Sequence, residues 1–233
     1  MIELQDVNHK FIIGKKGNER VVPVLHHINL KVNRGEIVSI VGRSGSGKST
    51  LLNLISGYIR PSSGEIVVDG VPVTKFSEGE WADFRLRRFG FIFQSFQLIP
   101  SMTAFENMAL PAVLSGMTER DRKQKTEAMM ERLGIADYAG FYPGELSGGQ
   151  QQRVSVGRAL LLEPPIILAD EPTGSLDSEN EQNLLELILE LNRESGITFL
   201  MITHDDKVAS IGHRQISLVD GRINEGGVQH AHA

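Results

Sequence analysis

The chain contains no cysteine, which excludes disulfide bonds and thiolate metal sites. It has no apolar run of the roughly 20 residues that a membrane-spanning helix needs. It also has no excess of positive charge, because 24 basic residues stand against 29 acidic ones and give a net charge of −5. That balance lacks the electrostatic signature of a protein that binds nucleic acid or an anionic membrane directly.

The remaining composition is that of a globular protein. The chain has 233 residues, of which 40% are hydrophobic and 23% charged, enough for one large domain or a core with a subdomain. Its first residues include Glu3 and Asp6, where a signal peptide needs a basic patch and an apolar stretch. We therefore expect a cytoplasmic protein that docks on a partner if it works at a membrane.

Short β-branched runs alternate with helical patterns along most of the chain. The predicted strands are 2–7, 21–32, 36–41, 89–93, 166–169, 197–203 and 215–219. The predicted helices of the same kind are 51–55, 178–193 and 208–212. This alternation predicts an α/β fold with a mostly parallel sheet. The middle differs, because 81–88 and 118–133 are helical and rich in charge, which indicates an inserted helical subdomain.

A glycine-rich loop follows the strand at 36–41. Residues 42–50 read Gly-Arg-Ser-Gly-Ser-Gly-Lys-Ser-Thr and match the phosphate-loop pattern G-x-x-x-x-G-K-[ST] in full. Glycines let successive N–H groups point at phosphate oxygens, and the following helix adds its positive dipole end. A simple strand-to-helix turn is the alternative, which the Lys-Ser pair disfavours. The pattern predicts a nucleotide site formed by Gly42, Ser44, Gly45, Ser46, Gly47, Lys48, Ser49 and Thr50.

Within this loop, Lys48 is expected at the β- and γ-phosphates and Ser49 at Mg²⁺. A second apolar strand, 166–169, ends in Asp170 and Glu171. Ligands of open α/β sheets bind at the carboxyl ends of strands, which places Asp170 to hold Mg²⁺ and Glu171 to polarise an attacking water as general base. Two acids that cap the next element are the alternative, and the phosphate loop favours the catalytic interpretation.

Residues 146–150, Leu-Ser-Gly-Gly-Gln, lie between these two motifs and resemble the signature of ABC (ATP-binding cassette) ATPases. A Ser-Gly pair can begin a helix whose N-terminus faces a phosphate, although the same pair is also a common helix cap. The other sequence motifs of ABC ATPases are also present, in the same order along the chain as in that family. The resemblance therefore assigns nucleotide contacts to Ser147, Gly148, Gly149 and Gln150.

The same resemblance implies roles that the patterns alone do not give. Phe11 would stack on adenine, with burial in the core as the alternative. Gln94 would reach the metal and lead to the transporter contact, and Asp177 would lie in a loop that crosses a dimer interface. His204 would touch the γ-phosphate, which completes a catalytic set with Lys48, Gln94 and Glu171.

For the fold, the resemblance implies one ABC ATPase domain. A RecA-like phosphate-loop core with an N-terminal antiparallel β subdomain would comprise 1–88 and 159–233, and a helical signature subdomain would comprise 89–158. Two ATPase subunits, either identical or related, would form a head-to-tail dimer around two ATP molecules with Mg²⁺. The dimer would lie on the inner face of the cell membrane and drive permease subunits on separate chains.

Three stretches, 41–53, 90–94 and 168–174, narrow the resemblance to exporters of the MacB and lipoprotein-release type. The chain looks most like the ATPase subunit of Ytr-type exporters of Gram-positive bacteria, which are associated with acetoin use. Export or MacB-type mechanotransmission would then be the work that ATP drives. Nothing in the residues themselves indicates acetoin.

Two further features of the sequence lead to expectations about the structure. Gly157 stands where relatives usually carry alanine, and we expect it to loosen the signature helix slightly. Phe96, Leu98, Ile99 and Met102 follow Gln94 and are apolar. They are expected either to be exposed for contact with a permease or to form ordinary core beneath a loop.

Other functions on the same cassette remain open. A soluble ABC ATPase acting on DNA or ribosomes would carry a long coiled-coil insertion or a second cassette, and this chain has neither. A cell-division cassette would need a permease-like partner that transports nothing. A kinase built on the phosphate loop is disfavoured by the signature and by Glu171.

Overall fold

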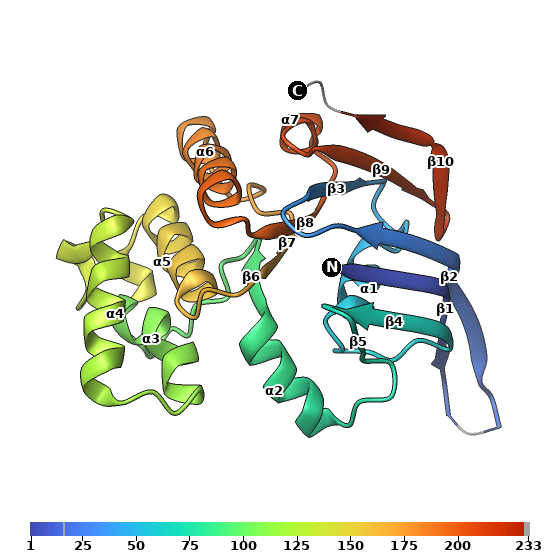
Figure 1. Cartoon of the computed structure of the whole chain (residues 1–233), viewed down its shortest axis with the longest axis horizontal. Helices are drawn as coiled ribbons and strands as arrows, with labels where there is room; N and C mark the ends of the chain where they lie inside the picture. The colour runs from blue at the N-terminus through green and yellow to red at the C-terminus, as the bar shows by residue number, and fades with distance from the viewer. Residues whose placement is uncertain (16, 231–233) are drawn as a thin grey trace. The chain divides into compact units, whose positions relative to one another are not determined.

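The computed structural model describes residues 1–15 and 17–230, with side chains described up to residue 224. The chain divides into two compact units (Figure 1). The first comprises Met1–Ala82 and Leu191–Ala233, and the second comprises Asp83–Glu190. The predicted helical subdomain, 89–158, falls inside the second unit, and its limits stay a prediction.

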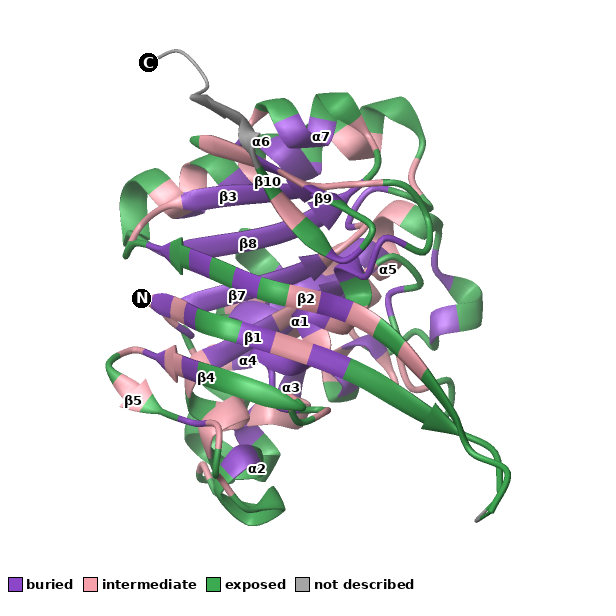
Figure 2. Ribbon diagram, turned by 90° about the vertical axis from the view of Figure 1, so that its right-hand side faces the viewer, coloured by how far each residue is buried: buried purple, intermediate pink, exposed green. Residues whose placement is uncertain are grey.

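An antiparallel sheet forms one part of the first unit. Its strands lie in the order β2-β1-β4-β5, where β1 is Ile2–Ile13, β2 is Arg20–Val32, β4 is Ser63–Val68 and β5 is Val71–Pro72. Apolar side chains alternate with polar ones along β1, so Ile2, Leu4 and Val7 are buried. The last four residues of β1 are exposed, where the hairpin with β2 extends away from the sheet (Figure 2).

Four other strands of the first unit lie beside each other in the order β10-β9-β3-β8, in which β9, β3 and β8 run parallel and β10 is antiparallel to β9. Their bounds are Arg222–His230 for β10, Arg214–Val219 for β9, Ile37–Val41 for β3 and Thr198–Thr203 for β8. Every residue of β8 and all but the last of β3 are buried, as purple strands in Figure 2 show. Buried parallel strands need near-continuous apolar runs, which explains why the sequence pattern found them.

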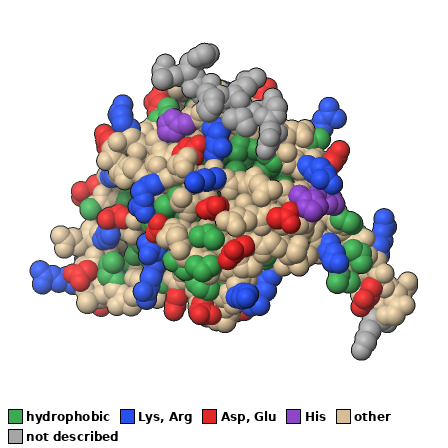
Figure 3. Space-filling model, turned by 45° about the vertical axis from the view of Figure 1, so that its right-hand side comes forward, with side chains coloured by type: hydrophobic (Ala, Val, Ile, Leu, Met, Phe, Trp, Pro, Cys, Tyr) green, Lys and Arg blue, Asp and Glu red, His purple; other side chains and the backbone are tan. Residues whose placement is uncertain are grey.

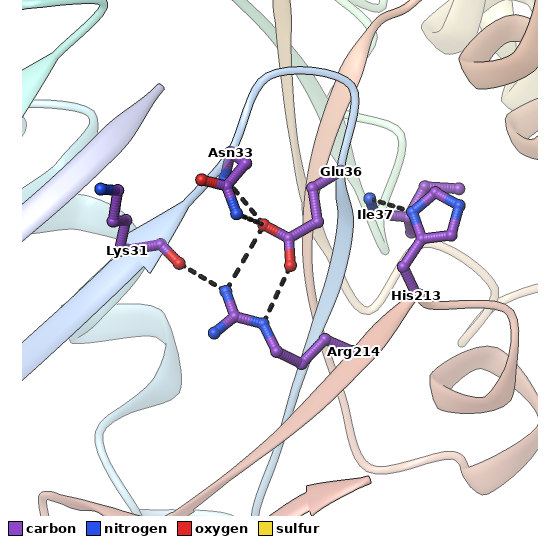
Figure 4. Close-up of polar contacts among 6 residues, drawn as sticks. All are labelled: Lys31, Asn33, Glu36, Ile37, His213 and Arg214. Atoms are coloured by element: carbon purple, nitrogen blue, oxygen red, sulfur yellow. Dashed lines mark hydrogen bonds and ion pairs between the residues drawn. The ribbon is translucent and has the colours of Figure 1, made fainter. Parts of the chain in front are cut away.

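Polar contacts fix the start of β3 against β2 and β9 (Figure 4). The Glu36 carboxylate accepts from the Arg214 Nε at 2.9 Å and from the backbone N–H of Asn33 at 2.7 Å. Arg214 also donates to the Lys31 carbonyl, and His213 Nδ1 accepts from the Ile37 N–H at 2.9 Å. Since Glu36 and Arg214 are both largely buried, this ion pair and its hydrogen bonds set where β3 enters the sheet.

The second unit joins two parallel strands to a group of helices. β6 (Phe89–Phe93) pairs with β7 (Ile166–Asp170). The helices are α3 (Ala104–Leu114), α4 (Glu119–Arg132) and α5 (Gly148–Leu160), with one-turn helices at Ala136–Tyr138 and Pro143–Glu145. They bury a common cluster that includes Met108, Met130, Leu133 and Val154.

The remaining helices are α1 (Lys48–Ile55), α2 (Glu78–Arg88), α6 (Ser178–Ser195) and α7 (Asp206–Ser210). Among the residues that the structure describes, no helix combines the length and hydrophobicity needed to cross a bilayer. The predicted α/β class, with an antiparallel sheet and a mostly parallel one, is confirmed. The sequence prediction lacked α3, which contains Pro111 and starts at a Thr103–Glu106 capping box.

Two local expectations change with the structure. Gly157 does not simply loosen α5, because a Cβ at that position would lie 2.4 Å from the Met108 Cε and 2.9 Å from a Leu133 methyl. Glycine therefore lets α3 pack closely on α5 at this point. Phe96 is 9% exposed and Leu98 packs against the helical core, so for these two residues the core alternative holds and the exposed docking patch does not.

Candidate nucleotide-binding site

The predicted phosphate loop joins β3 to α1 in the first unit. Gly47 is the N-cap of α1 with a left-handed φ of 103°, and no side chain caps the helix. Gly47 offers no side-chain oxygen to the first N–H groups of α1, and such a helix start suits an anion. Lys48 is buried, and its Nζ donates to the loop carbonyls of Gly42 at 2.7 Å and Arg43 at 3.4 Å.

The same loop fits a phosphate chain. Ser46 is buried, and its hydroxyl has no hydrogen-bond partner among the described residues. Gly42 must be glycine, because a Cβ there would lie 2.3 Å from the Leu218 carbonyl oxygen and 2.6 Å from the Ser46 Oγ. Ser44, Gly45 and Ser49 are exposed and Thr50 is half-buried. An uncapped helix N-terminus, an unpaired hydroxyl and a lysine in one loop are a ready site for an anion.

His204 emerges beside this loop. β3 and β8 run parallel, and their register pairs Val41 with Thr203. The next residue along each strand is Gly42 in one case and His204 in the other, so the phosphate loop and the histidine leave the sheet at adjacent points. His204 is exposed, and Asp205 after it caps α7.

Phe11 lies near the exposed end of β1. Its side chain is 39% exposed, which excludes the core alternative. The ring meets His9 edge-on at a centroid distance of 4.7 Å. His9 is buried and donates through Nδ1 to the Arg60 carbonyl, and burial lowers the pKa of its imidazole, opposed by that hydrogen bond. Figure 3 shows hydrophobic side chains exposed on the protruding β1–β2 hairpin, next to basic and acidic ones.

A matching arrangement occurs at the edge of the second unit. β6 and β7 run parallel, and their register pairs Phe93 with Asp170. Gln94 and Glu171 therefore follow at neighbouring points. The Gln94 side chain lies over Gly174, since a Cβ on that glycine would lie 2.7 Å from the Gln94 Nε2. Asp170 and Glu171 are both partly exposed.

Glu171 stands in an unusual backbone conformation. Its φ is +47°, in the left-handed region that residues other than glycine rarely adopt, and a proline follows it. The Gly174 N–H donates to the Glu171 carbonyl at 3.1 Å and closes a turn. A left-handed glutamate at the end of a buried strand is a form of strain that clusters at functional sites.

The signature residues form the N-terminus of α5. Ser147 is its N-cap, with the hydroxyl accepting from the Gln150 N–H at 3.3 Å and the Gln150 side chain accepting from the Ser147 N–H at 2.8 Å. This reciprocal pair is a capping box, as the predicted helix start requires. Ser147 and Gly148 are exposed. Because a hydroxyl that accepts a hydrogen bond still has its own proton, Ser147 can donate to an anion without losing the cap.

Asp177 and the signature are linked within the second unit. Hydrogen bonds from the backbone and side chain of Asn180, at 2.9 to 3.0 Å, lower the pKa of the Asp177 carboxyl. The same Asn180 amide lies over Gly149, where a Cβ would be 2.2 Å from the Asn180 Oδ1. The loop at 175–177 and the signature therefore contact each other through Asn180.

A partly buried cation holds the segment after Gln94. Arg158 of α5 donates to the Phe96 carbonyl at 2.8 Å and to the Gln97 carbonyl at 2.7 Å. Phe96 and Gln97 both have left-handed φ values, of 58° and 48°. Burial lowers the pKa of Arg158, yet a guanidinium stays charged at neutral pH. Its two charged hydrogen bonds thus stabilise a strained pair of residues.

The oxygen donors predicted for Mg²⁺ are the Ser49 hydroxyl in the first unit and the Asp170 and Gln94 side chains in the second. An all-oxygen set suits Mg²⁺, which also keeps water and phosphate ligands. Within the described part of the chain, no three histidine or acidic side chains cluster as a metal site. The joining of these donors around one Mg²⁺ ion stays a prediction.

Residues 25–174, which include the phosphate loop, the signature and the Asp170–Glu171 pair, match one family model, that of the ABC transporter. The chain belongs to the ABC transporter family. As an ABC transporter ATPase it is 62% identical to the ATP-binding protein YtrE of Bacillus subtilis strain 168, over 97% of this chain and 98% of that protein.

Other relatives connect this ABC transporter ATPase to the predicted exporter group. It is 43% identical to the lipoprotein-releasing system protein LolD of Bacteroides thetaiotaomicron, covering 87% of this chain and 93% of that protein. It is 45% identical to the macrolide export protein MacB of Bordetella avium over 96% of this chain, which spans 33% of that protein. The predicted family and its MacB, lipoprotein-release and Ytr-type resemblance are thus confirmed.

Solved structures agree with the fold. The dimeric structures of the cassette MJ0796, one of them in a post-hydrolysis state with ADP and phosphate, match the whole chain with a TM-score of 0.90 and 37% to 38% identity. The protein is therefore an ATP-binding, ATP-hydrolysing subunit of a membrane transporter, and the predicted enzyme class is confirmed.

Four residues at the site were not found from the sequence. Asn107, Gln152, Arg158 and Asn180 all bond to loop backbone or to a neighbouring motif. The available signal was a polar side chain within an apolar helical stretch, as for Arg158 between Val156 and Leu160. That signal marks a buried polar contact but does not identify its partner.

Proposed function

We propose that two ATPase subunits bind two ATP molecules head to tail and use their hydrolysis to drive a permease on separate chains, in export or MacB-type mechanotransmission. The relative YtrE supports the separate permease, because YtrE is named an ABC transporter ATP-binding protein and 98% of its own length aligns with this chain. The dimeric MJ0796 structures support the paired arrangement. The dimer would act at the inner face of the cell membrane.

The single observation that carries the nucleotide assignment is the uncapped N-terminus of α1 behind Lys48. We assign the β- and γ-phosphates to Lys48 and to the loop amides, and the buried Ser46 hydroxyl to a phosphate oxygen. His204, which leaves the sheet beside the loop, would orient the γ-phosphate. Phe11 would stack on adenine, since its ring is exposed and held edge-on by His9.

For the chemistry, Glu171 would accept a proton from the water that attacks the γ-phosphate, and Gln94 beside it would help to position that water. Ser49, Asp170 and Gln94 would hold Mg²⁺, which neutralises charge on the phosphates when bound. The Ser147 hydroxyl and the Gly148 and Gly149 amides of the facing subunit would complete the phosphate contacts. Gln150 and Asp177 hold that loop and helix end in shape.

The test compares the wild-type protein with Glu171→Gln. We expect the variant to lose ATP turnover by about 100-fold or more, the usual size of a general-base contribution, while it still binds ATP. We also expect ATP with Mg²⁺ to shift the variant to a dimer in size-exclusion chromatography coupled to light scattering. Turnover at the wild-type rate would remove Glu171 from the role of base.

The partner is tested with the same variant. Tagged Glu171→Gln protein with Mg-ATP is used to capture partners from detergent-solubilised membranes, with identification by mass spectrometry. We expect a permease that depends on ATP for its recovery and that stimulates ATP turnover of the wild-type subunit when both are reconstituted. Recovery of ribosomal or DNA-associated partners, with no stimulation by a membrane protein, would contradict the transporter assignment.

A further inference from the structure

Gln152 is a buried side chain of the signature helix that reaches the turn after Glu171. It is 3% exposed, and its Nε2 donates to the Pro172 carbonyl at 3.2 Å. Its Oε1 has no hydrogen-bond donor among the residues that the structure describes. A buried amide with one half unsatisfied lowers folding stability relative to an apolar side chain of similar size. Stability alone therefore does not account for a glutamine here.

The turn that Gln152 contacts carries the proposed base. Glu171 occupies its first position with a left-handed φ, although residues before proline favour extended backbone. The Gly174 N–H bonds back to the Glu171 carbonyl, and Gln152 holds the carbonyl of Pro172 between them. Since a strained backbone persists only where its surroundings over-determine it, the Gln152 bond belongs to what keeps this turn in place.

The helix that supplies Gln152 starts at the signature. Ser147 caps α5, and Gln152 lies little more than one turn further along the same helix. A shift of the helix N-terminus would therefore move the Gln152 amide against the Pro172 carbonyl. This places a rigid link between the end of α5 that faces phosphate and the turn that carries Glu171.

We propose that Gln152 is a positioning residue for Glu171, which ties the signature helix to the turn of the proposed base. This rests on the proposed function of Glu171 and of the signature. In the head-to-tail dimer, the signature of one subunit serves the partner's ATP while Glu171 serves its own. Gln152 thereby connects the occupancy of one ATP site to the geometry of the base at the other.

The test replaces the amide by an apolar side chain of similar length. Gln152→Met removes the donor and the unsatisfied acceptor together. Gln151→Met is the matched control, because Gln151 is the same residue type on the same helix and its Nε2 donates to a backbone carbonyl, that of Leu146, at 3.1 Å. Turnover, the KM for ATP and the thermal midpoint are measured for both variants and the wild type.

We expect Gln152→Met to lower kcat about 5- to 10-fold, the effect of one lost neutral hydrogen bond expressed in the transition state. The KM for ATP should stay within about twofold, because the phosphate loop is unchanged. The thermal midpoint should equal or exceed that of the wild type. Gln151→Met should keep kcat within about twofold of the wild type. A residue that only stabilised the fold would instead lower the thermal midpoint.

A second variant, Gln152→Glu, and a double variant test the same inference in other ways. Gln152→Glu turns a carboxylate toward the Pro172 carbonyl and should lower kcat further than Met does. In a Glu171→Gln background, Gln152→Met should have no additional effect on residual turnover, since the two residues act as one unit. Unchanged kcat in Gln152→Met would overturn the inference, and so would a fall in kcat matched by a fall in thermal midpoint. In either case an inactive Glu171→Gln variant would leave the proposed function standing. Normal turnover of Glu171→Gln would overturn both.

Discussion

The two helix N-termini that we assign to phosphate differ in how their amide groups are satisfied. α1 starts at Gly47 without any side-chain cap, whereas α5 starts at Ser147 with a complete capping box. An uncapped N-terminus leaves N–H groups unpaired and gains most from an anion. The capped one is already stable by itself. We therefore expect the phosphate loop to bind ATP in a single subunit, and the signature to add contacts only when a partner presents its nucleotide.

The loops around these helices differ in the same way. The phosphate loop is held by its own backbone and by Lys48, five to six residues away from the carbonyls it bonds. The segment after Gln94 is held by Arg158, more than 60 residues further along the chain. One region is thus built from local contacts, and the other from side chains that reach across the helical unit.

We expect the largest effect, a loss of ATP affinity, from a substitution in the phosphate loop. Lys48→Ala should weaken ATP binding by about 10- to 100-fold, the worth of a charged hydrogen-bond donor. Isothermal titration with ATP and Mg²⁺ measures this, with Lys75→Ala as an exposed-lysine control. ATP affinity unchanged by Lys48→Ala would contradict the assignment of the phosphate loop.

Removing the long-range contacts of Arg158 should lower folding stability and leave ATP affinity unchanged. Arg158→Met removes two charged hydrogen bonds to left-handed residues but also relieves a partly buried charge, so we expect a loss of about 2 kcal/mol in unfolding free energy. Arg153→Met is the control, since Arg153 donates to one carbonyl, that of Leu133, and should cost about 1 kcal/mol. Urea unfolding at equilibrium separates the two. Equal losses would show that the strained segment needs no Arg158.

Ser147→Ala compares the two helix ends directly. Loss of the cap should lower unfolding free energy by about 1 kcal/mol, as N-cap replacements do. ATP affinity of the single subunit should not change, because Ser147 lies outside the phosphate loop. The dimer formed by Glu171→Gln with ATP should become weaker. Weaker ATP binding by the monomeric Ser147→Ala subunit would contradict the division of labour between the two helices.

The sequence predicted the features that depend on local patterns and missed those that depend on long-range side-chain contacts. Strands such as 36–41 and 166–169 were found because parallel strands need continuous apolar runs, and the phosphate loop because its residues are contiguous. The charged helix at 118–133 was also predicted and is confirmed as α4, whose N-cap Thr118 accepts from the Asp121 N–H. The contacts of Gln152 and Arg158 could not be found, because no local pattern records which carbonyl a side chain reaches.

The expectation that Gly157 loosens α5 stays a prediction, and it can be measured. Glycine in a helix costs about 1 kcal/mol relative to alanine, which is the basis for expecting a looser α5. At this position the missing Cβ leaves room for the Met108 side chain, so Gly157→Ala exchanges a propensity gain for overpacking. The net change in unfolding free energy should stay within about 1 kcal/mol of zero in the wild type.

In a Met108→Ala background, where the obstructing atoms are gone, the same substitution should stabilise the protein by up to about 1 kcal/mol. Urea unfolding of the four proteins measures both differences, and equal effects of Gly157→Ala in the two backgrounds would mean that close packing of α3 is not why glycine stands there.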